Sequence, residues 1–230
     1  MQASRDVVLT NLAAIRERIG RAAERSGRSG ADVTLVAAAK SVAVEPLRWV
    51  ASAGVDAVGE NYVQELRDVR SALADLPITW HYIGTLRSGG ATLVADLADV
   101  VETVAGERAA RRLAGRAARS GKVLDVLLEV DLTGERTAAG PERVAALADL
   151  VADLEGLRLR GLMTVPPLTA TAEEARPWFR RLAAIRDDLR SSHPQVQGLS
   201  MGMSLDYSVA VEEGATMVRI GTALFGPRTT

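Results

Sequence analysis

Short apolar runs alternate with amphipathic segments along the whole of this 230-residue chain, and this alternation constrains its fold more than any other feature. Several runs are continuous in Val, Leu and Ile, as in strands that are buried on both faces of a parallel sheet. Eight strands are expected, at Val33–Ala39, Ala57–Gly59, Thr79–Ile83, Val100–Val104, Val123–Asp131, Leu157–Val165, Gly198–Gly202 and Thr216–Gly221.

The segments between these runs have helical spacing. They predict helices at Val44–Ala53, Asn61–Leu76, Ser88–Leu97, Glu107–Ser120, Pro141–Glu155, Ala172–Ser192 and Leu205–Glu213, with an extra N-terminal helix at Arg5–Ser26. Pro141 fits the first turn of its helix, and Gly121 fits the stop after Ser120. Eight alternating units in this length predict a single α/β domain over residues 1–230, a (β/α)8 TIM barrel. A doubly wound open sheet is the alternative.

Composition excludes several classes of function. The formal net charge is −1, which argues against nucleic acid as the main partner because phosphate binding needs a basic surface. The chain has no cysteine, so disulfides, thiolate catalysis and zinc–thiolate sites are excluded. The two histidines, His81 and His193, lie far apart, and no metal site is expected. No stretch reads as a signal peptide or a membrane span, so we expect a cytoplasmic protein, and a monomer because no long apolar patch remains.

Lys40 stands out because the chain has only two lysines among its 28 basic residues. It follows seven mostly apolar residues, at the end of the first expected strand. In a barrel of this kind the active site lies at the carboxyl ends of the strands. Unlike arginine, lysine can lose its proton and form a Schiff base with an aldehyde.

The last two strands end in loops that suit a phosphate group. They read Ser200-Met201-Gly202-Met203-Ser204 and Arg219-Ile220-Gly221-Thr222. Small residues let backbone N–H groups approach an anion, hydroxyl groups add donors, and barrels often bind phosphate at this position. Plain turns would look the same. Combined with a lysine at the same rim, the loops predict a ligand that carries both an aldehyde and a phosphate, as pyridoxal 5'-phosphate (PLP) does.

The chain resembles the pyridoxal phosphate homeostasis protein family over nearly its whole length. The matching stretches are Leu35–Lys40, Gly59–Glu65, Trp80–Gly84, Gly161–Met163, Leu199–Ser204 and Val218–Gly226, in this order. The resemblance implies a barrel like the PLP domain of alanine racemase. It also implies PLP bound on Lys40 and a part in intracellular PLP (vitamin B6) homeostasis, with no established turnover. PLP-dependent apoenzymes would be transient partners.

The resemblance also implies roles for individual residues. Lys40 would carry the cofactor as a covalent aldimine, and Arg219 would face the pyridine nitrogen. For Asn61 a helix N-cap is an equal alternative, and for His81 and Met201 a place in the core is favoured over a contact with the ring; His193 is expected at the surface. The expected cofactor-binding residues are Lys40, Asn61, His81, Ser200, Met201, Gly202, Ser204, Arg219, Gly221 and Thr222.

Two departures from the family pattern remove lysines. The family usually continues Leu-Gln-Ser-Asn-Lys where this chain has Leu86-Arg87-Ser88-Gly89-Gly90, and a second family lysine aligns with Ala138. Family behaviour that needs those lysines, such as an auxiliary binding site or cofactor hand-off, stays an open question for this chain, whereas binding on Lys40 does not depend on them.

Three other functions stay open on the sequence. The main alternative is a PLP-dependent amino-acid racemase of weak activity. Efficient racemisation needs a second base opposite the lysine, which in alanine racemase comes from a further domain and a partner subunit, and only a few residues follow the eighth expected strand. A Schiff-base aldolase would use Glu129 or Asp131 as its base. A protein-interaction module with structural PLP is the third.

Overall fold

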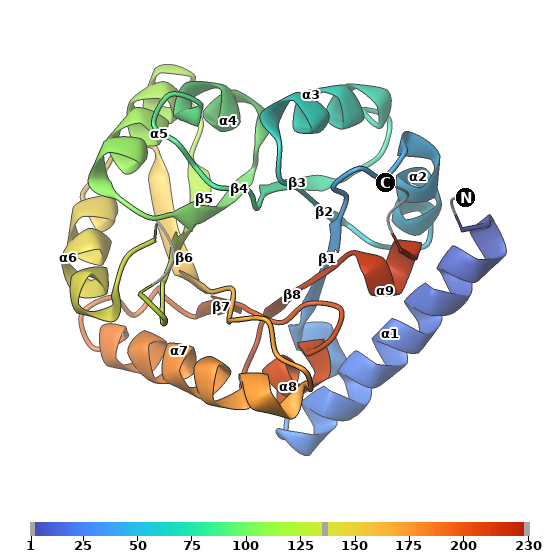
Figure 1. Cartoon of the computed structure of the whole chain (residues 1–230). Helices are drawn as coiled ribbons and strands as arrows, with labels where there is room; N and C mark the ends of the chain where they lie inside the picture. Colours follow the sequence, from blue (N-terminus) through green and yellow to red (C-terminus); the bar gives the residue numbers. More distant parts are fainter. Residues whose placement is uncertain (1–2, 135–137, 228–230) are drawn as a thin grey trace.

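The chain forms a closed barrel of eight parallel strands, β1 to β8 in sequence order, in a computed structural model that describes residues 3–134 and 138–227 (Figure 1). β1 pairs with β8, so that Val36 lies in register with Arg219, and no open edge remains. The (β/α)8 prediction is confirmed, and the open sheet is excluded. The strands are β1 (Thr34–Ala38), β2 (Ala57–Glu60), β3 (Thr79–Tyr82), β4 (Val100–Val104), β5 (Leu124–Glu129), β6 (Leu157–Met163), β7 (Gly198–Ser200) and β8 (Met217–Ile220).

Helices surround the barrel, and α1 lies outside this ring beside α2, α8 and α9 (Figure 1). Pro141 begins α6 as predicted, and Gly121, with a φ of 63°, ends α5 because it adopts a left-handed conformation. The helices are α1 (Arg5–Arg25), α2 (Val44–Ser52), α3 (Val63–Ala72), α4 (Ala91–Leu97), α5 (Glu107–Arg119), α6 (Pro141–Ala152), α7 (Arg176–Leu189), α8 (Tyr207–Glu212) and α9 (Thr222–Phe225), with short 3-10 helices η1 (Gly30–Asp32) and η2 (Glu173–Ala175).

Most observed elements are shorter than the predicted ones. β6 ends at Met163 although the apolar run continues to Val165, and β7 keeps only three residues. Hydropathy indicates which residues are buried, whereas a strand ends where its backbone stops pairing with the neighbouring strand. The predicted helix at Ala172–Ser192 is η2 followed by α7, with Pro177 in the first turn of α7. The one-turn helix α9 was not predicted, since four residues carry no periodicity.

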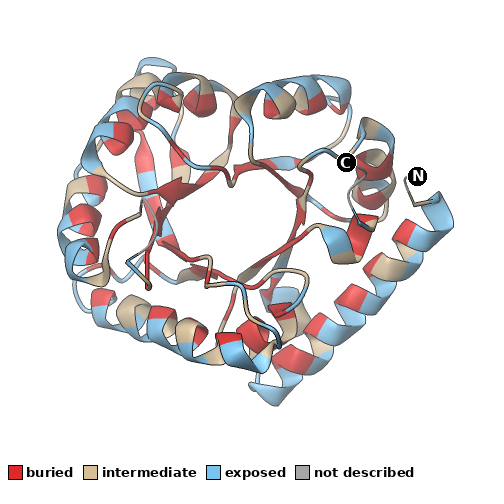
Figure 2. Cartoon of the chain, in the orientation of Figure 1, coloured by how far each residue is buried: buried red, intermediate tan, exposed pale blue. Residues whose placement is uncertain are grey.

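The core is aliphatic and lies between the barrel and the inner faces of the helices, where buried residues line the ribbons (Figure 2). α1 shows how it is built: Val8, Leu12, Ile15 and Ile19 recur every three or four residues and form one buried stripe. None of the helices in the described residues is both long and apolar enough to cross a membrane.

His193 corrects one expectation, because it was expected at the surface and is 8% exposed. Its Nε2 lies 2.8 Å from the Asp149 Oδ1 of α6. The turn after α7 therefore lies against α6, where the imidazole of His193 contacts the carboxylate of Asp149.

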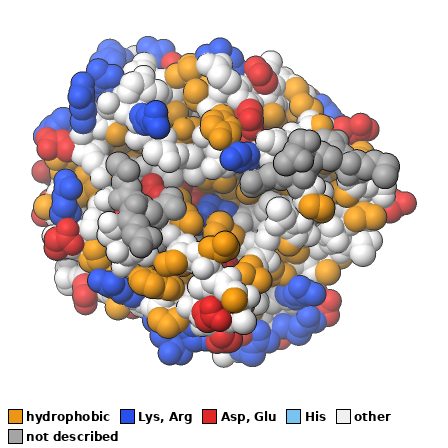
Figure 3. Space-filling view, in the orientation of Figure 1, with side chains coloured by type: hydrophobic (Ala, Val, Ile, Leu, Met, Phe, Trp, Pro, Cys, Tyr) orange, Lys and Arg blue, Asp and Glu red, His pale blue; other side chains and the backbone are white. Residues whose placement is uncertain are grey.

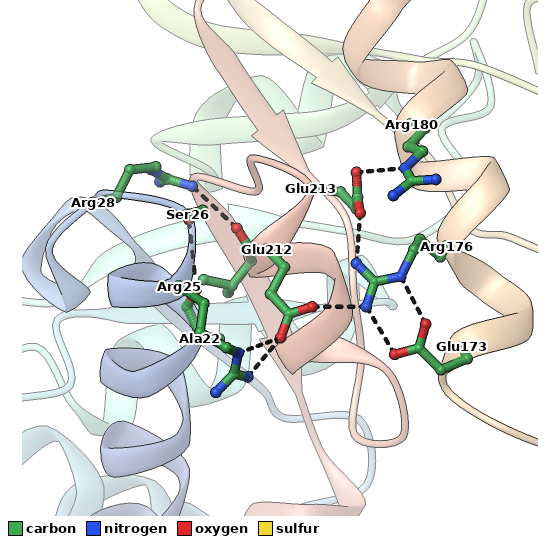
Figure 4. A network of polar contacts seen from close by, with 10 residues as sticks. Ala22, Arg25, Ser26, Arg28, Glu173, Arg176, Arg180, Glu212 and Glu213 are labelled. Carbon is green, nitrogen blue, oxygen red and sulfur yellow. Dashed lines mark hydrogen bonds and ion pairs between the residues drawn. The ribbon is translucent and has the colours of Figure 1, made fainter.

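An ion network ties α1, α7 and α8 together around Arg176 (Figure 4). The Arg176 guanidinium contacts Glu173 at 2.7 Å, Glu212 at 2.7 Å and Glu213 at 2.5 Å. Glu212 also pairs with Arg25 of α1. Burial raises the pKa of Glu212, but the hydrogen bonds from Arg176 and Arg25 outweigh it and leave this pKa lowered. Arg176 is therefore the cation that all three carboxylates share, while Arg25 and Arg180 are second partners of Glu212 and Glu213.

We predict that Arg176→Ala lowers the free energy of unfolding by about 1–3 kcal/mol, since three carboxylates would then face one another without their common cation. The matched control is Arg180→Ala, which removes an exposed side chain bonded only to Glu213, and it should cost less than about 1 kcal/mol. Urea unfolding at low and high salt measures the loss of unfolding free energy in both variants. High salt should reduce the difference between the two losses, because it screens the ion pairs. Equal costs for the two variants would contradict this role.

Candidate functional site

A cavity of about 390 Å³ opens at the carboxyl ends of the strands, where the sequence placed the site. It brings together Lys40, Asn61, Ser204, Arg219, Gly221 and Thr222, six of the ten predicted cofactor residues. Figure 3 looks onto this face, where the surface is hollowed near its centre and basic side-chain atoms lie inside the hollow. The volume is within the range of small-molecule sites.

Lys40 reaches the cavity because of the alternation along the first strand. Ala38 and Lys40 both line the cavity, two residues apart, as side chains on one face of a strand do. The Lys40 Nζ lies 5.2 Å from the centroid of the Tyr62 ring. The next residue, Ser41, has a φ of 61°, a left-handed conformation that is rare outside glycine. Lys40 therefore lies within a tight turn, which the Val42 N–H closes by donating to the Ala39 carbonyl at 2.8 Å.

Arg219 is 4% exposed and is held by groups from other strands. It donates to the Ser200 Oγ from Nη1 and, at 2.8 Å, to the Thr164 carbonyl from Nη2. The Ser200 hydroxyl in turn donates to Glu102 Oε2 at 2.5 Å. The guanidinium is thus fixed in position.

Glu102 balances this buried cation. It is fully buried, and its Oε1 lies 2.6 Å from the His81 Nδ1. Burial raises the pKa of Glu102, but His81, Arg219 and Ser200 outweigh that effect and leave the pKa lowered. Glu102 is therefore a carboxylate, 3.7 Å from Arg219. Sequence reasoning missed it, although a charged residue within the apolar run Val100–Val104 is a signal for a paired buried group.

Three predicted cofactor residues lie behind the cavity wall. Ser200 is fully buried between Arg219 and Glu102, and His81 is the hydrogen-bonded core histidine that the sequence favoured. Met201 is fully buried in the hydrophobic core. Their contact with a cofactor stays a prediction.

The loops after β7 and β8 form the other end of the cavity. Ser204 and Thr222 line it, and the Ser204 hydroxyl accepts a hydrogen bond from the Ala223 N–H at 3.0 Å. Gly202 does not line the cavity. Its role is to allow a backbone conformation and a close approach that a side chain would prevent. Its φ is 90°, and a Cβ there would lie 2.5 Å from the Ala210 Cβ. Gly202 therefore allows the loop to lie close to α8.

Asn61 is not the N-cap of α3, one of the two roles that its sequence position allowed. Tyr62 occupies the cap position, and no side chain caps the helix. Asn61 lies in the loop before it and lines the cavity. A contact between Asn61 and a cofactor stays a prediction.

The two carboxylates considered as aldolase bases differ in their surroundings. Glu129 lines the cavity. Asp131 is buried, and its Oδ1 accepts hydrogen bonds from the N–H groups of Thr133 at 2.9 Å and Gly134 at 3.0 Å. Asp131 therefore serves the loop after β5. Among the described residues, no group of three or more His, Asp or Glu side chains could hold a metal ion.

Gly90 and Ala138 stand where the family has lysines, and Arg87 is the basic residue closest to Gly90 in that stretch. Arg87 lines a second groove, of about 480 Å³, beside Tyr62 and Tyr82, and this groove shares Asn61 with the cavity. Gly90 is the N-cap of α4. Ala138 adjoins residues 135–137, which lie outside the described part of the chain.

Glu60, the last residue of β2, is fully buried, and neither of its carboxyl oxygens has a hydrogen-bond partner in the described residues. Burial raises its pKa to about 8, and the nearby Glu65 adds to the rise. The sequence placed Glu60 at the rim without a role. Gly59 and Asn61 face the barrel interior, so the alternation of strand residues directs Glu60 towards the helices.

The chain has the fold of the alanine racemase N-terminal domain class, and the model of that family, "Alanine racemase, N-terminal domain", matches residues 10–229. A solved alanine racemase of Clostridium difficile shares the fold, with a TM-score of 0.75 at 18% identity. It covers 98% of this chain and 60% of the racemase chain.

Two further relatives identify the family more closely. A pyridoxal phosphate homeostasis protein of Aquifex aeolicus is 40% identical over 220 residues, which are 94% of this chain and 96% of that protein. PipY of Synechococcus elongatus, solved with PLP bound, has a TM-score of 0.85 at 32% identity and covers 95% of this chain and 100% of its own. The chain belongs to the pyridoxal phosphate homeostasis protein family.

Glu60 generates a prediction about stability. The pKa of Glu60 in the folded protein is about 8 against an ordinary 4.5, so its contribution to stability is fully present below pH 4.5 and is lost as the pH rises to about 8. Relative to Glu60→Gln, the free energy of unfolding of the wild type should fall across this window by up to about 1.4 kcal/mol per pH unit. Urea unfolding from pH 4.5 to 9 measures this. The control is Glu45→Gln, which changes an exposed carboxylate and keeps Glu60, so its curve should run parallel to that of the wild type. Parallel curves for wild type and Glu60→Gln would refute the assignment.

Proposed function

We propose that this chain holds PLP covalently, as a Schiff base on Lys40, and takes part in intracellular PLP homeostasis without turning over a substrate. The observation that carries the proposal is the gathering of Lys40, Arg219, Ser204 and Thr222 around one cavity. The PLP-bound structure of PipY and the names of the relatives support it.

The residues present fit the chemistry of the cofactor. When bound, PLP supplies an aldehyde that condenses reversibly with an amine and releases water. Lys40 is the only lysine on the cavity wall, within the described residues. Ser204 and Thr222 offer hydroxyl groups for the phosphate, and Gly221, directly before Thr222, adds backbone without a side chain to the same wall. Phosphate sites of barrel proteins commonly lie after strands seven and eight.

Arg219 favours holding over turnover. A permanently charged guanidinium that faces the pyridine nitrogen keeps this nitrogen unprotonated, so the ring withdraws electrons less strongly. Ser200, Thr164 and Glu102 hold that guanidinium in place. A carbanion next to the cofactor would be poorly stabilised, which suits a protein that stores a reactive aldehyde. We further propose that the chain works as a cytoplasmic monomer and releases PLP transiently to apoenzymes that need it.

We predict that Lys40→Arg abolishes covalent PLP binding, because arginine keeps the positive charge but forms no Schiff base. The measurement is the visible absorption of protein mixed with PLP, followed by borohydride reduction and peptide mass mapping. Lys122→Arg is the matched control. Lys122 is the only other lysine of the chain, and its Nζ donates a hydrogen bond to the Ala98 carbonyl. A visible band that persists in Lys40→Arg, or label found only at Lys122, would overturn the site.

The absence of turnover has its own test. Purified protein loaded with PLP is incubated with L-alanine and with D-alanine, and the opposite enantiomer is measured over time. No sustained conversion above the rate of free PLP is expected. Sustained racemisation that is lost in Lys40→Arg would establish the enzyme alternative instead.

A further inference from the structure

The turn that carries Lys40 is conformationally strained and needs support. Ser41, with a φ of 61°, is the only non-glycine residue with a positive φ in the described part of the chain. Such a conformation costs about 1–2 kcal/mol for a residue other than glycine. The Val42 N–H donates to the Ala39 carbonyl at 2.8 Å, which closes the turn. The Ser41 N–H donates to a side chain, the Glu65 Oε2, at 3.2 Å.

Glu65 connects this turn to the buried Glu60. It lies in the first turn of α3, half-buried, and one of its oxygens is bound to the Ser41 amide. Its charge and its hydrogen-bonding position both act on Glu60 and disfavour ionisation there. The segment from 60 to 65 therefore approaches the lysine turn from two sides, since Tyr62 also places its ring near the Lys40 Nζ.

The surroundings of Glu60 disfavour a second negative charge beside Glu65. Glu60 is fully buried, and an isolated charge in such surroundings is unfavourable by several kcal/mol. Within the described residues, the titratable group that acts on Glu60 is Glu65 from α3, and its register partner on β3 is Tyr82, whose pKa burial raises. A protonated Glu60 has an O–H donor, and the carboxylate of Glu65 is the acceptor beside it.

We propose that Glu60 and Glu65 share one proton and together position the Lys40 turn, with Glu60 donating to Glu65 and Glu65 accepting from the Ser41 amide. The pair then carries one negative charge, which is directed at the turn. Glu60 is in this view a positioning residue, because it acts on Lys40 through Glu65 and Ser41. The inference deepens the proposed function, since the position of Lys40 matters most if Lys40 captures PLP.

The experiment compares variants that keep or remove the donor. Glu60→Gln keeps a donor of the same size, Glu60→Leu removes it but still fills the buried space, and Glu65→Ala removes the acceptor. Glu45→Ala, an exposed carboxylate at the start of α2, is the matched control. The first readout is hydrogen exchange of the Ser41 amide by NMR on protein without PLP. The second is the rate of covalent PLP capture at Lys40.

We expect Ser41 exchange to rise by roughly tenfold in Glu60→Leu and Glu65→Ala, the effect of losing one hydrogen bond. Glu60→Gln and Glu45→Ala should stay within about twofold of the wild type. The rate of covalent PLP capture should be lower in Glu60→Leu and Glu65→Ala than in the wild type. In Glu60→Gln it should equal the wild-type rate. Above about pH 8 the wild type should exchange faster than Glu60→Gln, because only the wild type loses the shared proton.

Two results would overturn the inference. One is a Ser41 amide exchange rate in Glu60→Leu equal to that of the wild type. The other is a wild-type Ser41 exchange rate in Glu65→Ala. If Glu60→Leu does not fold, the Glu65→Ala result alone decides the question. Failure of the proposed function would look different: the wild type would capture no PLP, while Ser41 exchange, measured without PLP, would still report on the carboxyl pair.

Discussion

The pairing of β1 with β8 is the constraint on which the rest of the structure depends. It joins segments about 180 residues apart in sequence and sets Val36 opposite Arg219. Lys40 and Thr222 then leave neighbouring strands at the same end of the barrel. In an open sheet these strands could lie at opposite edges, and Lys40 would not meet the loop after β8. The cavity is therefore a consequence of closure.

The interior of the barrel beneath the cavity is polar, which is costly unless every charge is balanced. Arg219, Ser200, Glu102 and His81 form one connected set that spans β8, β7, β4 and β3. Removing any member would leave a buried partner without its hydrogen bond, and such a loss is larger than the net value of the bond. The set explains why this barrel holds Arg219 rigidly, whereas a solvent-exposed arginine would keep its rotamer freedom.

The sequence predicted the barrel and the meeting of Lys40 with the loops after β7 and β8 at one rim, because these follow from periodicity and from strand ends. It could not predict which side of the cavity wall each residue occupies. Ser200 ends β7 and was expected to contact phosphate, yet its hydroxyl lies between Arg219 and Glu102. Glu102 lies where the register between β4 and β5 shifts, from Val101 to Val104. Such an irregularity changes which side chains face inwards and leaves no periodic signal. The role of Gly202 likewise depends on how closely its loop packs against α8, the next element in the chain, which periodicity does not show.

Glu102 and Glu60 show how the same burial produces opposite outcomes. Both are fully buried, and burial alone raises the pKa of each. Glu102 has Arg219 and His81 as partners, so its charge is retained and the cation beneath the cavity stays fixed. Glu60 has a second carboxylate, Glu65, as its neighbour, and no cation among the described residues is recorded as acting on it, so a proton neutralises it. The barrel thus contains one carboxylate whose charge is locked and one carboxyl whose proton can leave near physiological pH. Only the second adjoins the segment that holds Lys40, so any response of this site to pH is expected to begin at the lysine turn rather than at Arg219.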